Sequence, residues 1–343
     1  MPPAQIAHAR PIEKRRTASP AARTALCAIV SVAAIVAIWA WRFSAVEVPA
    51  SAPQLADEVL AVMRDRLLTA TVVGLSLGAA GVLLRTATRN PLADPEITGV
   101  NSGAAFGAVA VTTAGMGQSS LGVLPGAFLG GALAAAITVG LGLGSKTARL
   151  AGAASIQRMV LLGIAVSALF SALTSIFLVL DEAQLATVLS WLSGRIGGVR
   201  LPEVTACAIA AALMLPLALA MGRGFDLLAA GDETAASVGA HPQRLRIVAI
   251  AMAVFLVAPA VAAVGPIGFL GLMAATFAQR VCGTRHRLSL VAAPLVGAVV
   301  LLVADALAQA LWAPAETPVG IVTSLAGVPL LLWGISTLRK GGR

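Results

Sequence analysis

Long apolar stretches recur along the whole chain, and no other feature restricts its possible folds as strongly. A helix needs about 20 mostly apolar residues to cross the hydrocarbon core of a bilayer. The 343-residue sequence is 58% hydrophobic and only 11% charged, whereas soluble domains average about 25% charged residues. The alternating pattern of membrane β-strands is absent. The sequence therefore predicts an all-α polytopic membrane protein.

Ten candidate spans can be marked, of which the third and the eighth are short. They cover about residues 24–41, 67–84, a segment ending near 113, 121–143, 159–180, 202–221, 247–264, 267–281, 288–311 and 319–338. Residues 1–23 are polar and basic, and we expect them to form a cytoplasmic tail. Residues 24–338 then form one transmembrane permease domain, with both termini on the same side of the membrane.

The net charge of +9 is explained by the expected topology. Cytoplasmic loops of membrane proteins are enriched in Lys and Arg. With the N-terminus inside, only five of the 24 Lys and Arg residues fall in outer segments, namely Arg42, Arg64, Arg66, Arg195 and Arg200. The charge therefore places both termini in the cytoplasm and requires no nucleic-acid partner.

A long polar segment, residues 222–246, interrupts the apolar pattern after the sixth span. Asp232 and Glu233 suit the first turn of a helix, Gly239 suits its end, and Pro242 follows shortly after. The pattern predicts a short helix over about residues 232–238. Such a helix is too short and too polar to span a bilayer, so we expect it to lie in the cytoplasm and contact another protein.

Motifs for chemistry are weak in this sequence. The segment 140–147 approaches a phosphate-binding loop, but Ser145 replaces its second essential glycine, so we expect no nucleotide site. The three cysteines lack metal-site spacing and suit packing positions. Glycine pairs at 74/78, 103/107, 126/130 and 140/144 predict close helix packing. Asp305 lies inside an apolar span, where it marks either a transport pathway or a structural partner near the outer interface.

Three stretches together resemble one family of proteins. They are residues 89–106, residues 227–239, and residues 264–272 taken with Asp305, 314–323 and 327–329. The sequence is similar there to the FecCD/BtuC-like permeases, the transmembrane subunits of bacterial type II ABC importers for iron-siderophores, haem and cobalamin. The resemblance covers nearly the whole chain beyond the N-terminal tail.

The resemblance implies a type II importer permease fold in the bacterial plasma membrane. A second permease subunit, identical or paralogous, would pair with this one around a central path. A cytoplasmic ATPase dimer would grip coupling helices within residues 223–246, and a periplasmic or lipid-anchored binding protein would dock outside. The chain would then be no enzyme, would need no cofactor, and would have only membrane lipid and the iron-siderophore ligand as further partners.

The resemblance also implies roles for individual residues. ATPase coupling would involve Asp232, Glu233, Thr234, Ala235, Ala236, Val238 and Gly239. Docking of the binding protein would involve Arg64, Arg66 and Glu316. The translocation path, or the structure around it, would involve Asn90, Pro91, Asp94, Pro95, Asn101, Gly103 and Asp305.

The sequence departs from the family pattern at three places, which affects the expected docking geometry and ligand. The segment Arg64-Asp65-Arg66 lacks the usual proline, Gln309 replaces an arginine, and Ala275-Thr276 replaces Pro-His. A ferric siderophore is the leading cargo, with haem or cobalamin as alternatives. A secondary transporter remains a second class, because the segments 90–95 and 265–268 could break helices around an ion site. A membrane enzyme lacks a set of catalytic groups.

Overall fold

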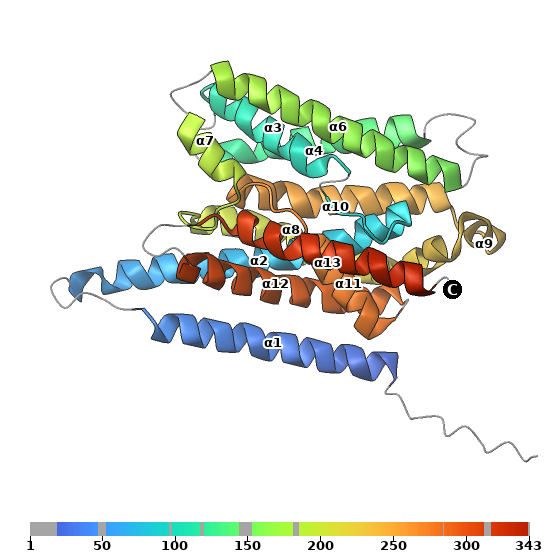
Figure 1. Cartoon of the computed structure of the whole chain (residues 1–343), viewed down its shortest axis with the longest axis horizontal. Coiled ribbons are helices and arrows are strands. Elements are labelled where there is room, and N and C mark those ends of the chain that lie inside the picture. Colours follow the sequence, from blue (N-terminus) through green and yellow to red (C-terminus); the bar gives the residue numbers. More distant parts are fainter. Residues whose placement is uncertain are drawn as a thin grey trace, which may run out of the picture.

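The protein is a bundle of long helices that run side by side in a computed structural model (Figure 1). The structure describes residues 19–46, 53–95, 98–116, 120–143, 153–180, 185–283, 285–311 and 317–341. Within these ranges every regular element is helical. The elements are α1 (Pro20–Ser44), the 3₁₀ turn η1 (Pro53–Leu55), α2 (Ala56–Thr88), α3 (Val100–Thr113), α4 (Ser120–Leu143), α6 (Ala153–Leu180), α7 (Leu185–Leu192), α8 (Leu201–Ala230), α9 (Asp232–Ser237), α10 (Pro242–Val264), α11 (Leu270–Cys282), α12 (His286–Leu311) and α13 (Val319–Gly341).

The predicted all-α polytopic fold is confirmed. Seven described helices are long and apolar enough to cross a membrane, namely α1, α2, α4, α6, α8, α10 and α12. Two further helices, α3 and α11, have 14 and 13 residues. The apolar part of α13 covers Val319–Leu330. Together these helices agree with the ten spans expected from the sequence.

The two short helices, α3 and α11, each follow a non-helical segment. The helix α2 ends at Thr88 and is followed by Arg89, whose φ of 48° is left-handed, and α3 begins after Gly99, whose φ is 80°. The helix α10 ends at Val264 and is followed by Gly265 with φ 76°, where a Cβ would lie 2.0 Å from the carbonyl oxygen of Trp191. Only glycine tolerates that conformation and that approach together. The prolines of both segments prevent the preceding helix from continuing.

The core is formed by α2 and α10, which are largely buried, with α1 and α6 at opposite edges of the bundle (Figure 1). Small residues allow close packing there. A Cβ at Gly78 would lie 2.3 Å from the carbonyl oxygen of Ala293 in α12, and one at Gly107 would lie 2.0 Å from that of Gly126 in α4. The expected close packing is thus seen at the first three glycine pairs. Gly140 has nothing within 4 Å, and Gly144 lies outside the described residues.

Several helices extend beyond the expected spans. The helix α2 begins at Ala56 rather than near residue 67, and α8 continues to Ala230 rather than ending near residue 221. Hydropathy marks the part of a helix that suits hydrocarbon, whereas the helix itself can continue into water. The helix α1 begins at Pro20 and is capped by Ser19, so the end of the expected tail is helical. Residues 1–18 lie outside the described part.

Candidate functional site

The predicted cytoplasmic helix is α9, a six-residue helix between α8 and α10 at one end of the bundle (Figure 1). Gly231, with φ 130°, allows the sharp change of direction between α8 and α9. Ala235, on the inner face of α9, is completely buried. Glu233, Thr234, Ala236, Val238 and Gly239 are exposed. The segment therefore presents mostly small side chains to its surroundings.

Asp232 anchors α9 to the bundle. Its Oδ1 accepts hydrogen bonds from Arg89 Nη2 at 2.9 Å and from Arg246 Nη2 at 3.1 Å. Each arginine also donates from Nε to a helix end, Arg89 to Leu228 O at 3.1 Å and Arg246 to Ala87 O at 2.8 Å. Charge-assisted bonds of this kind are stronger than neutral ones. One carboxylate thus connects α9 to the ends of α2, α8 and α10.

Arg89 and Arg246 are functional candidates that the sequence reasoning did not select. Only 4% of the Arg246 side chain is exposed, and Arg89 completes the network from a left-handed backbone position. In the sequence, their positive charge was explained only by the enrichment of Lys and Arg in cytoplasmic loops. The available signal was their position, since each lies at the junction of an apolar span with a polar segment that contains proline.

Asp94 holds the start of α11 from the segment that follows α2. Its Oδ2 accepts from the Phe269 amide at 3.2 Å and its Oδ1 from the Leu272 amide at 3.0 Å. The side chain of Asp94 is buried. A carboxylate there satisfies amides that have no partner within the helix, and it interacts favourably with the positive end of the helix dipole. Asp94 is therefore a structural cap in the described part of the chain.

The remaining path candidates separate into two regions. A cavity of about 730 Å³ at the α9 end is lined by Asn90 and Pro91 together with Arg85 and Arg285. A second cavity of about 700 Å³ is lined by residues of α3, α13 and the segment before α11, including Asn101. Asn101 Oδ1 is buried with no hydrogen-bond partner among the described residues.

Two of the path candidates have local structural contacts. Gly103 packs against α4, since a Cβ there would lie 2.5 Å from Gly130 O. Pro95 O accepts a hydrogen bond from Thr98 Oγ1 at 3.0 Å. The two residues therefore have local roles in helix packing and in the backbone turn before α3.

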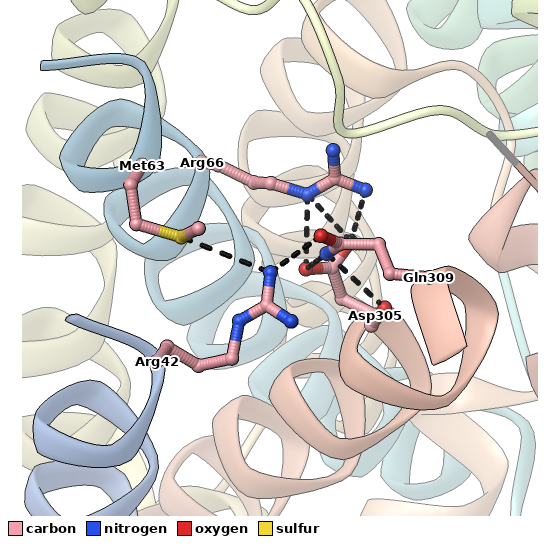
Figure 2. A network of polar contacts seen from close by, with 5 residues as sticks. All are labelled: Arg42, Met63, Arg66, Asp305 and Gln309. Carbon is pink, nitrogen blue, oxygen red and sulfur yellow. Dashed lines mark hydrogen bonds and ion pairs between the residues drawn. The ribbon is translucent and has the colours of Figure 1, made fainter. Parts of the chain in front are cut away.

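Asp305 forms an ion pair with Arg66 that joins α12 to α2 (Figure 2). Arg66 Nε lies 3.0 Å and 3.1 Å from the two carboxylate oxygens, and Arg66 Nη2 lies 2.9 Å from Oδ1. The side chains are 12% and 2% exposed. Of the two roles considered for Asp305, this geometry describes a structural partner.

Gln309 extends the ion pair to a third helix (Figure 2). Its Nε2 donates to Asp305 Oδ2 at 2.7 Å, and its Oε1 accepts from Arg42 Nη2 of α1. Arg42 Nη2 also lies 3.7 Å from Met63 Sδ. Where the family pattern has an arginine on α12, this protein has a glutamine that binds an arginine of α1.

The docking candidates differ in how accessible they are. Arg66 is engaged by Asp305, whereas 49% of the Arg64 side chain is exposed beside Asp65. Glu316 lies outside the described residues. The third departure from the family pattern is also used internally, because Thr276 Oγ1 accepts from Arg85 Nη2. Docking roles for Arg64 and Arg66 stay predictions.

Comparisons with known proteins agree with this architecture. The probable siderophore transport system permease YfiZ of Bacillus subtilis (strain 168) is 38% identical over 81% of each chain. The Fe(3+) dicitrate permease FecD of Escherichia coli (strain K12) is 35% identical, over 80% of this chain and 83% of that one. The cobalamin import permease BtuC of Halobacterium salinarum is 36% identical, over 82% of this chain and 74% of that one.

A solved structure and a family profile complete the comparison. The structure is that of a metal-chelate type ABC transporter in an inward-facing conformation. It superposes with a TM-score of 0.79 at 27% identity and covers 91% of this chain and 99% of that one. The profile described as the FecCD transport family matches residues 24–337. A profile match over nearly the whole bundle, with relatives above 30% identity, shows that the chain belongs to the FecCD transport family.

Proposed function

We propose that this chain is the transmembrane permease subunit of an ATP-binding-cassette importer, and that it carries a ferric-siderophore-type chelate into the cytoplasm. The anchoring of α9 is the observation that best supports the proposal. Asp232 binds both Arg89 and Arg246, so a movement of α9 is coupled to α2 and α10. Its exposed residues leave a surface on which a separate ATPase can act.

The proposed partners follow from the two ends of the bundle. A cytoplasmic ATPase dimer contacts the exposed residues of α9 and the turn after it, including Ala236 and Val238. A substrate-binding protein docks at the opposite end, near Arg64. The protein then lies in the bacterial plasma membrane with both termini in the cytoplasm.

A second permease subunit is supported by the cavity that Asn101 lines. Ser193 and Ser324 line the same cavity, and Asn101 Oδ1 is buried without a partner. Polar groups at membrane depth are stable only beside protein or water. A second permease subunit facing this cavity would enclose a polar path, which lipid could not do.

The cargo is proposed from the relatives. YfiZ is named for siderophores and FecD for ferric dicitrate, whereas the archaeal relative BtuC is named for cobalamin. Because two of these three relatives are named for a siderophore or a ferric chelate, we favour a ferric chelate as the cargo. Cobalamin is the alternative that one of the relatives supports, and haem is the third cargo of the wider family.

Transport by the reconstituted complex tests the proposal. Proteoliposomes would contain the permease, its ATPase and its binding protein, and uptake of a radiolabelled ferric siderophore would be measured with cobalamin or haemin as competitors. We expect uptake to require ATP hydrolysis and to resist an uncoupler. Uptake that persists without hydrolysis, or collapses with an uncoupler at constant ATP, would instead indicate an ion-driven transporter. Stronger competition by cobalamin or haemin would reassign only the cargo.

A further inference from the structure

A groove of about 720 Å³ separates α1 from the helices it packs against. Its walls are apolar and include Leu26 and Val30 of α1, Phe277 of α11 and Val299 of α12. Among the residues that line it, only Arg23 and Arg280 carry a charge. The volume lies within the range of about 300–1,000 Å³ that is typical of pockets for small ligands.

The two arginines lie at the same end of the groove. Arg23 is in the first turn of α1 and Arg280 is in the last turn of α11. These turns lie at the end of the bundle that carries α9 (Figure 1). Both side chains are exposed. The groove thus has a basic rim near the membrane surface and an apolar interior that continues along α1 toward the middle of the membrane.

This arrangement matches the shape and charge of one molecule class. We propose that the groove binds an anionic phospholipid, with an acyl chain between α1 and α11–α12 and the phosphate at Arg23 and Arg280. In a bilayer an apolar groove facing lipid is filled by acyl chains, so the basic rim determines which headgroup is preferred. A guanidinium has five N–H donors in a fork that suits phosphate, so it can bind a lipid while it keeps a contact within the protein.

A second apolar groove provides an internal comparison. It has a volume of about 360 Å³ and lies between α4 and α10, lined by residues such as Phe128, Ile247 and Phe255. No charged residue lines it. Lipid there would have no partner for its headgroup charge, so the proposed selectivity belongs to the groove at α1.

The bound lipid would hold the basic end of α1 against the bundle. The opposite half of α1 is joined by direct polar contacts, from Trp39 Nε1 to Thr71 Oγ1 at 3.2 Å and from Arg42 to Gln309. In the basic half, Thr24 and Ser31 of α1 are buried, so the cavity separates only part of this half from its neighbours. An acyl chain and a bound phosphate would fill that part.

The test uses the full-length permease purified in a neutral detergent. Phosphatidylglycerol and phosphatidylcholine with identical acyl chains are added separately, and bound lipid is counted by native mass spectrometry while thermal unfolding is followed. We expect phosphatidylglycerol to be retained preferentially and to raise the Tm more. Two basic groups near a membrane surface together favour anionic lipid by about 30-fold, so the double variant Arg23→Gln/Arg280→Gln should lose most of this preference.

Matched controls separate the groove from general charge effects. Arg158→Gln removes an exposed arginine near the start of α6, away from the groove, and should keep the full preference. Ala34→Phe fills the apolar part of the groove and should reduce retention of both lipids with both arginines intact. Equal retention of the two lipids by the unaltered protein, or an equal loss in Arg158→Gln, would overturn the proposal. Inorganic phosphate that stabilises as well as phosphatidylglycerol would overturn it too, because the apolar wall would then contribute nothing.

Discussion

Single carboxylates join separate helices of this permease: Asp94 and Asp305 are buried, and Asp232 is partly exposed. Asp232, Asp94 and Asp305 each accept hydrogen bonds from groups on other elements. A charge placed in an apolar bundle is costly unless it is paired and hydrogen-bonded, so removing one partner leaves the other uncompensated. The clearest predictions at the scale of residues therefore concern these three groups.

Asp232→Asn should uncouple ATP hydrolysis from transport. The substitution removes the charge that holds Arg246, whose side chain is 4% exposed, and so loosens α9 from α2 and α10. We expect uptake per ATP hydrolysed to fall several-fold in proteoliposomes, while the ATPase still binds. Asp57→Asn, which neutralises an exposed carboxylate in the first turn of α2, is the matched control and should transport normally. Equal coupling in the two variants would contradict the anchoring role.

Asp305→Asn should destabilise the permease without involving the ATPase. Arg66 and Arg42 would then lose the carboxylate charge that attracts both, and breaking a buried pair costs about 3–5 kcal/mol. Thermal unfolding in detergent should show a clear decrease in Tm. The double variant Asp305→Leu/Arg66→Met removes both charges and should recover most of that loss. A double variant as unstable as the single one would show that the ion pair is not the cause.

At the scale of elements, the sequence predicted what depends on local composition. The apolar stretches located the spans, because insertion into hydrocarbon depends on the residues of each segment. The helix predicted at 232–238 corresponds to α9, which ends one residue earlier, at Ser237. Its acidic first turn and the glycine after it are the local signals. Hydropathy could not locate the ends of α2 and α8, because their outer turns continue beyond the apolar stretch.

The contacts between elements could not be predicted in the same way. Arg66 and Asp305 are 239 residues apart, and Arg42 and Gln309 are 267 residues apart. No local pattern connects such pairs. The resemblance therefore gave Arg66 an expected docking role, although its side chain is paired with Asp305 inside the bundle.

Helix α9 should be sensitive to bulk on either face, for different reasons. Ala235 is completely buried, so Ala235→Trp should displace α9 and lower the Tm of the isolated permease. Ala236 is exposed, so Ala236→Trp should leave the Tm unchanged but prevent co-purification of the ATPase and transport. Unchanged transport by Ala236→Trp would argue against an ATPase contact at this face.

Helix α11 should depend on its cap. Asp94→Ala leaves the amides of Phe269 and Leu272 without a partner in a buried site. Loss of an N-terminal cap costs about 0.5–2 kcal/mol, so we expect a decrease in Tm. Asp94→Asn keeps an accepting oxygen and should lose less. Hydrogen exchange at residues 269–273 would show whether the change is local, and unaltered protection there in Asp94→Ala would contradict the capping role.

At the scale of the whole molecule, the ends of the bundle have different expected roles. The α9 end carries the anchor network, and the opposite end carries the Arg42–Gln309–Asp305–Arg66 network and the exposed Arg64. The proposed mechanism needs the first end in the cytoplasm and the second outside.

Cysteine labelling of intact cells tests this orientation. In a background without the three native cysteines, His241→Cys should react with a membrane-impermeant maleimide only after the cells are opened. Arg64→Cys should react in intact cells, because half of that side chain is exposed at the other end. The reverse pattern would invert the topology and place α9 where no cytoplasmic ATPase could reach it.

The short segment after α2 has a mechanical consequence. Arg89 and Asp94 are five residues apart, and Arg89 is bonded to α9 whereas Asp94 is bonded to α11. A push on α9 would thus reach α11 through this short segment, because Asp94 is bonded to the first turn of α11. Pro91, which lies between Arg89 and Asp94, limits how far this segment can stretch or fold. A movement of α9 on the aqueous side would therefore be passed on to Phe269, which lines the second cavity.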